Sequence, residues 1–290
     1  FNDIESASFG NDGMRVALTL SMADVDIVLQ SASEKNEVTT ISNSNSIDTS
    51  ARFSPNGSTI VYLSDQAGYQ QVFQYKSGVK QLFFANTAKE IINSPPLWST
   101  DGKRVLINTS SQLFMVDADT LEKSVVSKGT NFLYAYEWYQ NEHALLVDYK
   151  IDDGLTLAKY DLNSQMLMPL ASGNIHHAHL VQGNNLIVIK NNKIVKITDN
   201  QEVIIFEPRE NQKIVASVSM DNGLLFQLNS IREGSMGKKE LWQINTLNNK
   251  LIYIAEVANS FDKITDATSD GNERLFITPV QQEKDIVLLQ

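Results

Sequence analysis

A turn followed by an apolar strand recurs along the chain, and this repeat limits the possible folds more than any other feature. In each copy an apolar or aromatic residue leads into a short polar turn, which often ends in Asn-Gly or Asp-Gly. Successive copies start 38 to 49 residues apart. Strand repeats of about 40–50 residues are typical of β-propeller blades. The seven copies start at Phe9, Phe53, Trp98, Trp138, Leu180, Val218 and Ala267.

The copy that starts at Phe53 shows why the unit predicts strands. Pro55 fixes φ at the start of a turn, and Asn56-Gly57 tolerate positive φ, so the chain can reverse tightly. Short apolar runs follow at 60–63, 72–75 and 81–84, and turn residues separate them. No apolar period of 3.6 residues is sustained along the chain. The pattern therefore predicts antiparallel β-meanders and an all-β fold.

Seven copies predict a seven-bladed propeller, with six blades as the alternative. The whole chain, 1–290, is predicted to be one domain. Apolar segments for three strands follow Ala267, and none remains for a fourth, so the last blade is expected to be incomplete unless a strand from elsewhere closes it. The approximate blade limits are 1–45, 46–90, 91–130, 131–173, 174–210, 211–259 and 260–290.

Composition excludes several classes of protein. Apolar residues make up 42% of the chain, which is enough for a sizeable core, yet no stretch approaches the length of a membrane-spanning helix. The net charge of −10 argues against direct nucleic-acid binding. The absence of cysteine excludes disulfides and thiolate metal sites and fits a periplasmic protein, although a cytoplasmic one can also lack thiols. Because the chain begins at Phe1 without a leader, it is expected to be part of a longer protein.

Two copies of the repeat resemble a known family. Phe-Ser-Pro-Asn-Gly at 53–57 and Trp-Ser-Thr-Asp-Gly at 98–102, the latter followed by Lys103-Arg104, are similar to the TolB-like propeller repeat. The resemblance implies a TolB-like propeller. It is close in the second and third copies, weaker in the first and last, and poor in the middle three.

Proteins with this repeat serve in several settings, and the resemblance leaves several functions open. They include a periplasmic partner of the Tol system, the propeller of prolyl-oligopeptidase-like peptidases, oligogalacturonate lyases, and the periplasmic half of membrane-anchored winged-helix regulators similar to CadC and ToxR. An acidic, cysteine-free propeller with degenerate repeats most resembles the last of these. We therefore expect a non-catalytic, periplasmic sensor that binds a protein or a small molecule at a channel mouth and meets the membrane only through a tether outside this chain.

Three of the four histidines lie together in Ile175-His176-His177-Ala178-His179, on a predicted innermost strand. Strand alternation places His177 and His179 on one face, where they could present imidazoles to a ligand in the channel. The structural alternative is a pair that lines the channel or responds to pH. Metal binding by such histidines would favour a metal-dependent lyase of the oligogalacturonate-lyase kind, but metal sites in this fold draw ligands from several blades, and only His143 lies elsewhere.

Aromatic residues near the fourth copy provide the remaining candidates. Tyr134 and Tyr136 lie on the predicted innermost strand and are candidate ligand-binding residues, together with His177 and His179. The long hairpin at 229–239 is a second possible place for a partner, with a tolerated insertion as the alternative. The chain contains no Gly-x-Ser-x-Gly and no phosphate-cradling loop before a helix, so no catalytic residue, metal ligand or cofactor is predicted. A TolB-like periplasmic scaffold is the third functional possibility.

Overall fold

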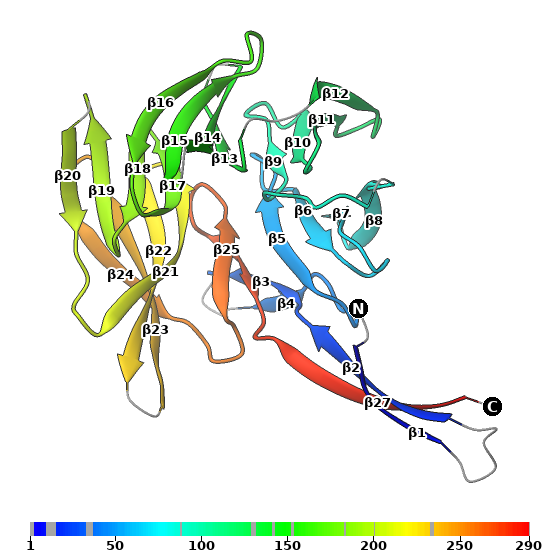
Figure 1. Ribbon diagram of the computed structural model, residues 1–290. Helices are drawn as coiled ribbons and strands as arrows, with labels where there is room; N and C mark the ends of the chain where they lie inside the picture. Colours follow the sequence, from blue (N-terminus) through cyan, green and yellow to red (C-terminus); the bar gives the residue numbers. More distant parts are fainter. Residues whose placement is uncertain are drawn as a thin grey trace.

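The computed structural model describes the chain except residues 1–2, 10–15, 33–36, 88, 129–131, 141–142, 152–153, 183, 200, 233–234 and 290. All regular secondary structure in the described part is β-strand, so this part holds no helix that could cross a membrane. Its strands form six four-stranded sheets and one three-stranded sheet. Figure 1 shows the six larger sheets arranged as blades around a common centre.

We label the blades A to F in the order of their innermost strands. Blade A holds β5 (Asp48–Phe53), β6 (Thr59–Ser64), β7 (Gln71–Lys76) and β8 (Val79–Phe84), and blade B holds β9 (Leu97–Trp98), β10 (Arg104–Asn108), β11 (Gln112–Asp117) and β12 (Lys123–Lys128). Blade C holds β13 (Tyr134–Trp138), β14 (Ala144–Ile151), β15 (Gly154–Asp161) and β16 (Leu167–Ser172). Blade D holds β17 (Ile175–Val181), β18 (Asn185–Lys190), β19 (Lys193–Thr198) and β20 (Gln201–Phe206), and blade E holds β21 (Gln212–Met220), β22 (Gly223–Arg232), β23 (Ser235–Asn245) and β24 (Leu251–Glu256).

Blade F closes the ring with strands from both ends of the chain. It combines β25 (Lys263–Ala267) and β26 (Glu273–Ile277) with β3 (Ile27–Ser31) and β4 (Val38–Thr40). Phe276 pairs with Val28, and Ile277 with Ile27. The innermost strand of each blade contacts the innermost strand of the next, and β25 contacts β5, so the ring is complete.

The predicted count of seven blades is therefore wrong, and the alternative of six is confirmed. The last blade is not incomplete either. Residues 1–45 and 260–290 were expected to form two blades, but together they supply the single blade F and a sheet that projects from it. Sequence spacing could not show this closure, because the strands that pair in blade F lie more than 200 residues apart in the chain.

The projecting sheet accounts for the first copy of the repeat. It consists of β1 (Asp3–Phe9), β2 (Val16–Asp24) and β27 (Gln281–Leu289), with β2 in the middle. The pairing of β26 with β3 continues into that of β27 with β2, so a long ribbon leaves the propeller (Figure 1). The predicted turn of the first copy falls within residues 10–15, which lie outside the described residues.

The turn after the innermost strand has a shared hydrogen-bond pattern in blades A, B and F. In blade A the Ser54 hydroxyl donates to Asn56 Oδ1 at 2.8 Å and accepts the Thr59 amide at 3.0 Å, and the Gly57 amide donates to the Ser54 carbonyl. Gly57 has φ +72°, a conformation that glycine adopts without strain. Turns built around Ser99 and Thr268 repeat this pattern. The recurrent sequence motif thus specifies a closed turn.

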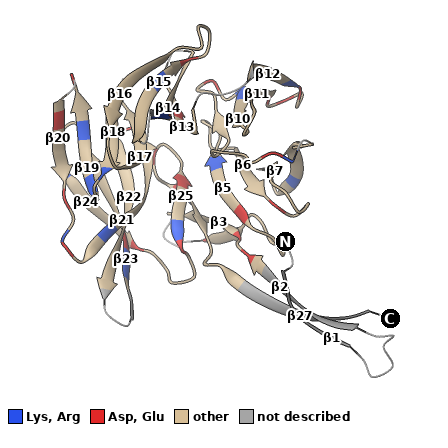
Figure 2. Cartoon of the chain, in the orientation of Figure 1, with Lys and Arg blue, Asp and Glu red and all other residues tan. Residues whose placement is uncertain are grey.

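The apolar faces of the blades form the core. The described residues hold six buried apolar clusters, one between each pair of neighbouring blades. Phe53 is buried between blades F and A, while Trp98 and Trp138 pack against the clusters between A and B and between B and C. The apolar core of the propeller therefore lies between the blades, and Figure 2 shows Lys, Arg, Asp and Glu at scattered positions with most of each strand uncharged.

Candidate ligand-binding mouth

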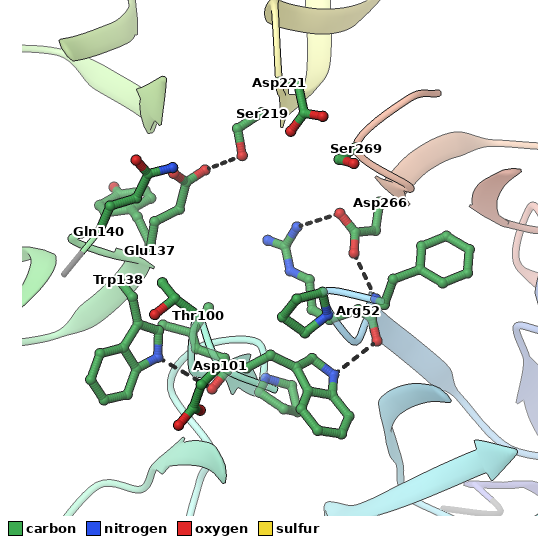
Figure 3. Close-up of a pocket in the computed structure, with 16 residues that line it drawn as sticks. Arg52, Thr100, Asp101, Glu137, Trp138, Gln140, Ser219, Asp221, Asp266 and Ser269 are labelled. Carbon is green, nitrogen blue, oxygen red and sulfur yellow. Dashed lines mark hydrogen bonds and ion pairs between the residues drawn. The ribbon is translucent and has the colours of Figure 1, made fainter. Parts of the chain in front are cut away.

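A cavity of about 710 Å³ opens at the end of the channel where the innermost strands finish. Blades A, B, C, E and F contribute to its lining. Arg52 and Asp266 lie on one side, and Glu137 and Ser219 lie on the other (Figure 3). Trp98, Trp138, Asp101 and Asp221 also line it. A concave site shared by several elements is the usual form of a ligand pocket. We call this cavity the mouth.

Strand register identifies one equivalent position in each blade at this level. Phe53, Trp98, Trp138, Leu180, Ser219 and Ala267 each pair with the first residues of the next strand in their blade. The residue before each of these forms a belt around the channel. In the order F, A, B, C, D, E the belt reads Asp266, Arg52, Leu97, Glu137, His179, Val218. Each half of the ring therefore contributes an acidic, a basic and an aliphatic residue to the belt, in that order.

The first half of the belt is an ion pair between blades F and A. Arg52 Nη1 lies 3.5 Å from Asp266 Oδ1 and donates to the Thr265 carbonyl at 3.1 Å. Asp266 Oδ2 accepts the Phe53 amide at 2.7 Å. Burial raises the pKa of Asp266, and the charge of Arg52 opposes that rise. The pair therefore joins two blades at the floor of the mouth.

The second half is a chain of hydrogen bonds through blades C, D and E. His179 Nδ1 donates to Glu137 Oε1 at 2.8 Å, and Nε2 lies 2.8 Å from Ser217 Oγ. Glu137 also accepts the Leu180 amide and the Ser219 hydroxyl, each at 2.8 Å. Because a carboxylate only accepts, Nδ1 of His179 carries the proton in the bond to Glu137. Nε2 and the Ser217 hydroxyl form the second hydrogen bond of the ring.

The order of hydroxyl, imidazole and carboxylate is the one that serine hydrolases use. Here Ser217 is only 8% exposed and does not line the mouth. What the geometry shows is a link between three blades. Both ring nitrogens of His179 are engaged by it, so neither is directed at a metal. Among the residues that the structure describes, no group of three or more His, Asp or Glu side chains is placed to hold a metal ion.

The four residues expected to bind ligand occupy different surroundings. His179 belongs to the belt, and Tyr136 lines the mouth, where its hydroxyl donates to Asp148 Oδ2 at 3.1 Å. Tyr134 packs against Tyr136 with the rings tilted by 51° and their centroids 4.7 Å apart, and burial raises the pKa of both phenols. Neither Tyr134 nor His177 lines the mouth. A ligand-binding role for the four stays a prediction.

His177 lies two residues before His179 on the same strand, and its pKa is lowered. Burial lowers its pKa to about 4, and the nearby charges of His179, Lys263, Arg52 and His176 act in the same direction. An unfolded histidine titrates near 6.5. His177 is therefore neutral in the folded protein over a range in which the unfolded chain binds a proton.

This difference predicts a loss of stability in acid. The contribution of His177 to the free energy of unfolding is complete above pH 6.5 and falls as the pH drops toward 4, by roughly 3 kcal/mol. The His177→Gln variant should lose less stability than the wild type between these limits, as measured by urea unfolding at several pH values. The exposed His143 provides the control, since His143→Gln should follow the wild-type pH profile. Identical profiles for wild type and His177→Gln would contradict the assignment.

Sequence reasoning missed Arg52, Glu137 and Asp266. Their signal was available, because each immediately precedes the position at which its copy of the repeat starts. A comparison of the copies at that position would have selected all three, because each is a charged residue on an otherwise apolar or polar strand end. Their pairing across blades depends on the ring and could not be read from the spacing. The hairpin at 229–239, the other candidate, is formed by β22 and β23 at the end of the blade away from the mouth.

Comparison with known proteins agrees with this architecture. A family model described as PD40, TolB beta propeller domain, matches residues 2–179. No curated protein matches the chain in sequence. The structure is similar to a protein provisionally assigned as TolB from Agrobacterium tumefaciens, with a TM-score of 0.64 and 10% identity over 88% of this chain and 98% of that one.

Two further solved structures share the fold. An oligogalacturonate lyase from Vibrio parahaemolyticus gives a TM-score of 0.57 with 12% identity, over 86% of this chain and 78% of that one. The extracellular domain of a provisionally assigned one-component system from B. thetaiotaomicron gives 0.51 with 13% identity, over 81% of this chain and 33% of that one. At these identities the likeness establishes the fold alone. The repeat, the six-bladed ring and the match over more than half of its length together show that this chain belongs to the TolB β-propeller family.

Proposed function

We propose that this propeller is a non-catalytic binding domain that recognises a ligand or protein segment at its mouth. The observation that carries the proposal is the cavity of about 710 Å³, to which five of the six blades contribute. A ligand seated there would touch the turns of opposite blades at once. Binding would then favour one arrangement of the blades over others, and this shift in the conformations of the domain would report that the ligand is present.

We further propose that the domain works outside the cytoplasm, as the sensing part of a membrane-anchored regulator. The extracellular domain of a one-component system with the same fold supports this setting, as do the TolB structures. The absence of cysteine is compatible with it. The regulator's other parts would lie in segments that this chain does not include.

A thermal-shift screen with matched surface variants tests the binding role. Periplasmic solutes and peptides are screened for compounds that raise the melting temperature, since a ligand of the folded state stabilises it. Ser269 is exposed at the mouth, and Ser110 is exposed on the opposite face. Ser269→Trp should fill the mouth and weaken the selected ligand at least about tenfold, while Ser110→Trp should leave its affinity unchanged.

The same preparation distinguishes the alternatives. If Ser110→Trp weakens binding and Ser269→Trp does not, the mouth is not the binding site. Cleavage of oligogalacturonate by the purified protein, together with a metal found by elemental analysis, would replace the sensor proposal with a lyase. Failure of every compound and peptide in the screen to stabilise the wild type would favour a scaffold role.

A further inference from the structure

The two halves of the belt differ in how completely their basic residue is satisfied. His179 has a partner at each ring nitrogen and lies outside the mouth lining. The side chain of Arg52 makes its hydrogen bonds to the described residues through Nη1 alone. Its Nε is buried and has no acceptor among those residues. Nη2 also has no partner among those residues and, unlike Nε, is not one of the fully buried polar atoms, so it remains open to a ligand.

The Nη2 group of Arg52, which has no partner among the described residues, faces the mouth. Its side chain is 24% exposed and lines the cavity. Figure 3 shows the guanidinium with one nitrogen at Asp266 and another directed into the open middle of the cavity. Nη2 therefore offers a charge-assisted hydrogen bond to an acceptor in the cavity, and a carboxylate is an acceptor that a guanidinium binds strongly. Asp266 and Thr265 hold the group in place from the other side.

Charges at the rim restrict what can reach Arg52. Asp101 and Asp221 are exposed at the rim on blades B and E, which are opposite each other in the ring. Neither carboxylate forms an ion pair with a described residue. A doubly charged anion such as phosphate would meet repulsion from both. A single carboxylate, with one negative charge, would meet weaker repulsion from these two residues. A cationic group on the same ligand would be attracted to the rim.

We infer that the ligand of the mouth is zwitterionic and peptide-like, with a carboxylate that binds Arg52 and an ammonium or guanidinium group that faces Asp101 or Asp221. This inference rests on the proposed function and specifies its ligand. Trp98 and Trp138 line the same cavity and add aromatic surface for the apolar part of the ligand. A free basic amino acid and the carboxyl end of a basic peptide share this chemistry.

Arginine side-chain NMR gives a direct test. The Nε–H signal of Arg52 is assigned as the one missing from Arg52→Lys. The probes are the tripeptide Ala-Lys-Ala with a free carboxylate, its C-terminal amide, and free lysine, each titrated to millimolar concentration. The free-acid tripeptide should shift the Arg52 signal, and its amide should bind at least about tenfold more weakly. The response to free lysine shows whether the amino acid suffices or the peptide is needed.

Variants provide the second part of the test. Arg52→Lys keeps the charge but loses the planar group in which Asp266 and Thr265 hold Nη1 while Nη2 faces the mouth, and should weaken the tripeptide at least about tenfold. Arg209→Lys is the matched control, because Arg209 is exposed between blades D and E and should not affect binding. The comparison of acid with amide uses the wild-type protein, so it does not depend on how a variant folds.

Three results would overturn the inference: equal binding of acid and amide, a shift confined to other arginines, or no shift with any probe. The proposed function would survive each of them if a ligand from the thermal-shift screen still lost affinity in Ser269→Trp.

Discussion

Replacing Ile27 with alanine is expected to lower the free energy of unfolding by about 2–5 kcal/mol, because the change leaves a cavity where the ring closes. Ile27 is fully buried in β3 and pairs with Ile277 of β26. It lies in the cluster between blades F and A. Its amide donates to Ser42 Oγ at 2.8 Å, so the surrounding backbone is fixed and cannot collapse readily into the space.

Ile91 provides a control with the same side chain. It is 67% exposed in the connection between blades A and B, and Ile91→Ala should change the free energy of unfolding by less than about 0.5 kcal/mol. Both variants can be measured by urea unfolding followed by tryptophan fluorescence. Equal effects of the two substitutions would mean that the strands near the two ends of the chain do not share a packed blade.

Replacing Glu137 with alanine is the second large effect expected, a loss of about 3 kcal/mol. The carboxylate of Glu137 accepts hydrogen bonds from His179, Ser219 and the Leu180 amide. Its removal leaves these three donors without their acceptor in the partly buried centre of the ring. Glu137→Gln keeps one acceptor oxygen and should lose less.

Glu202 is the matched control for this prediction. It is 44% exposed and pairs with Lys190 at 2.6 Å on the outer strand of blade D. Exposed ion pairs contribute little, so Glu202→Ala should cost less than about 1 kcal/mol. If Glu137→Ala were as stable as Glu202→Ala, the belt would not be the link between blades that we describe.

Local chemistry made the repeated unit predictable from sequence. Ser54, Asn56 and Gly57 form a closed turn that needs those residue types, and the same types recur at 99–102 and 268–271. The copies that start at Trp138, Leu180 and Val218 no longer carry these residue types, yet the apolar strands of blades C, D and E are buried between neighbours. The β-propeller, its TolB-like character and the innermost strands of the six blades therefore followed from short-range patterns, whereas the first copy was wrongly given a blade of its own.

Long-range pairing was not predictable in the same way. Nothing local distinguishes Val16–Asp24, which projects on the ribbon, from the second strand of a true blade. Only the pairing of Val28 with Phe276 reveals that both ends of the chain share blade F. For the site, strand alternation selected His177 and His179, but the partners of His179 come from blades C and E and depend on the closed ring.

The most direct test of the account is whether ligand covers the mouth, and the lack of cysteine makes this simple to measure. Single cysteines are introduced as Ser269→Cys at the mouth and Ser110→Cys on the opposite face, and their rates of reaction with a maleimide are compared. The account predicts that a ligand found in the thermal-shift screen slows labelling at position 269 and leaves position 110 unaffected. Unchanged labelling at 269 under saturating ligand, or protection at 110 alone, would contradict it.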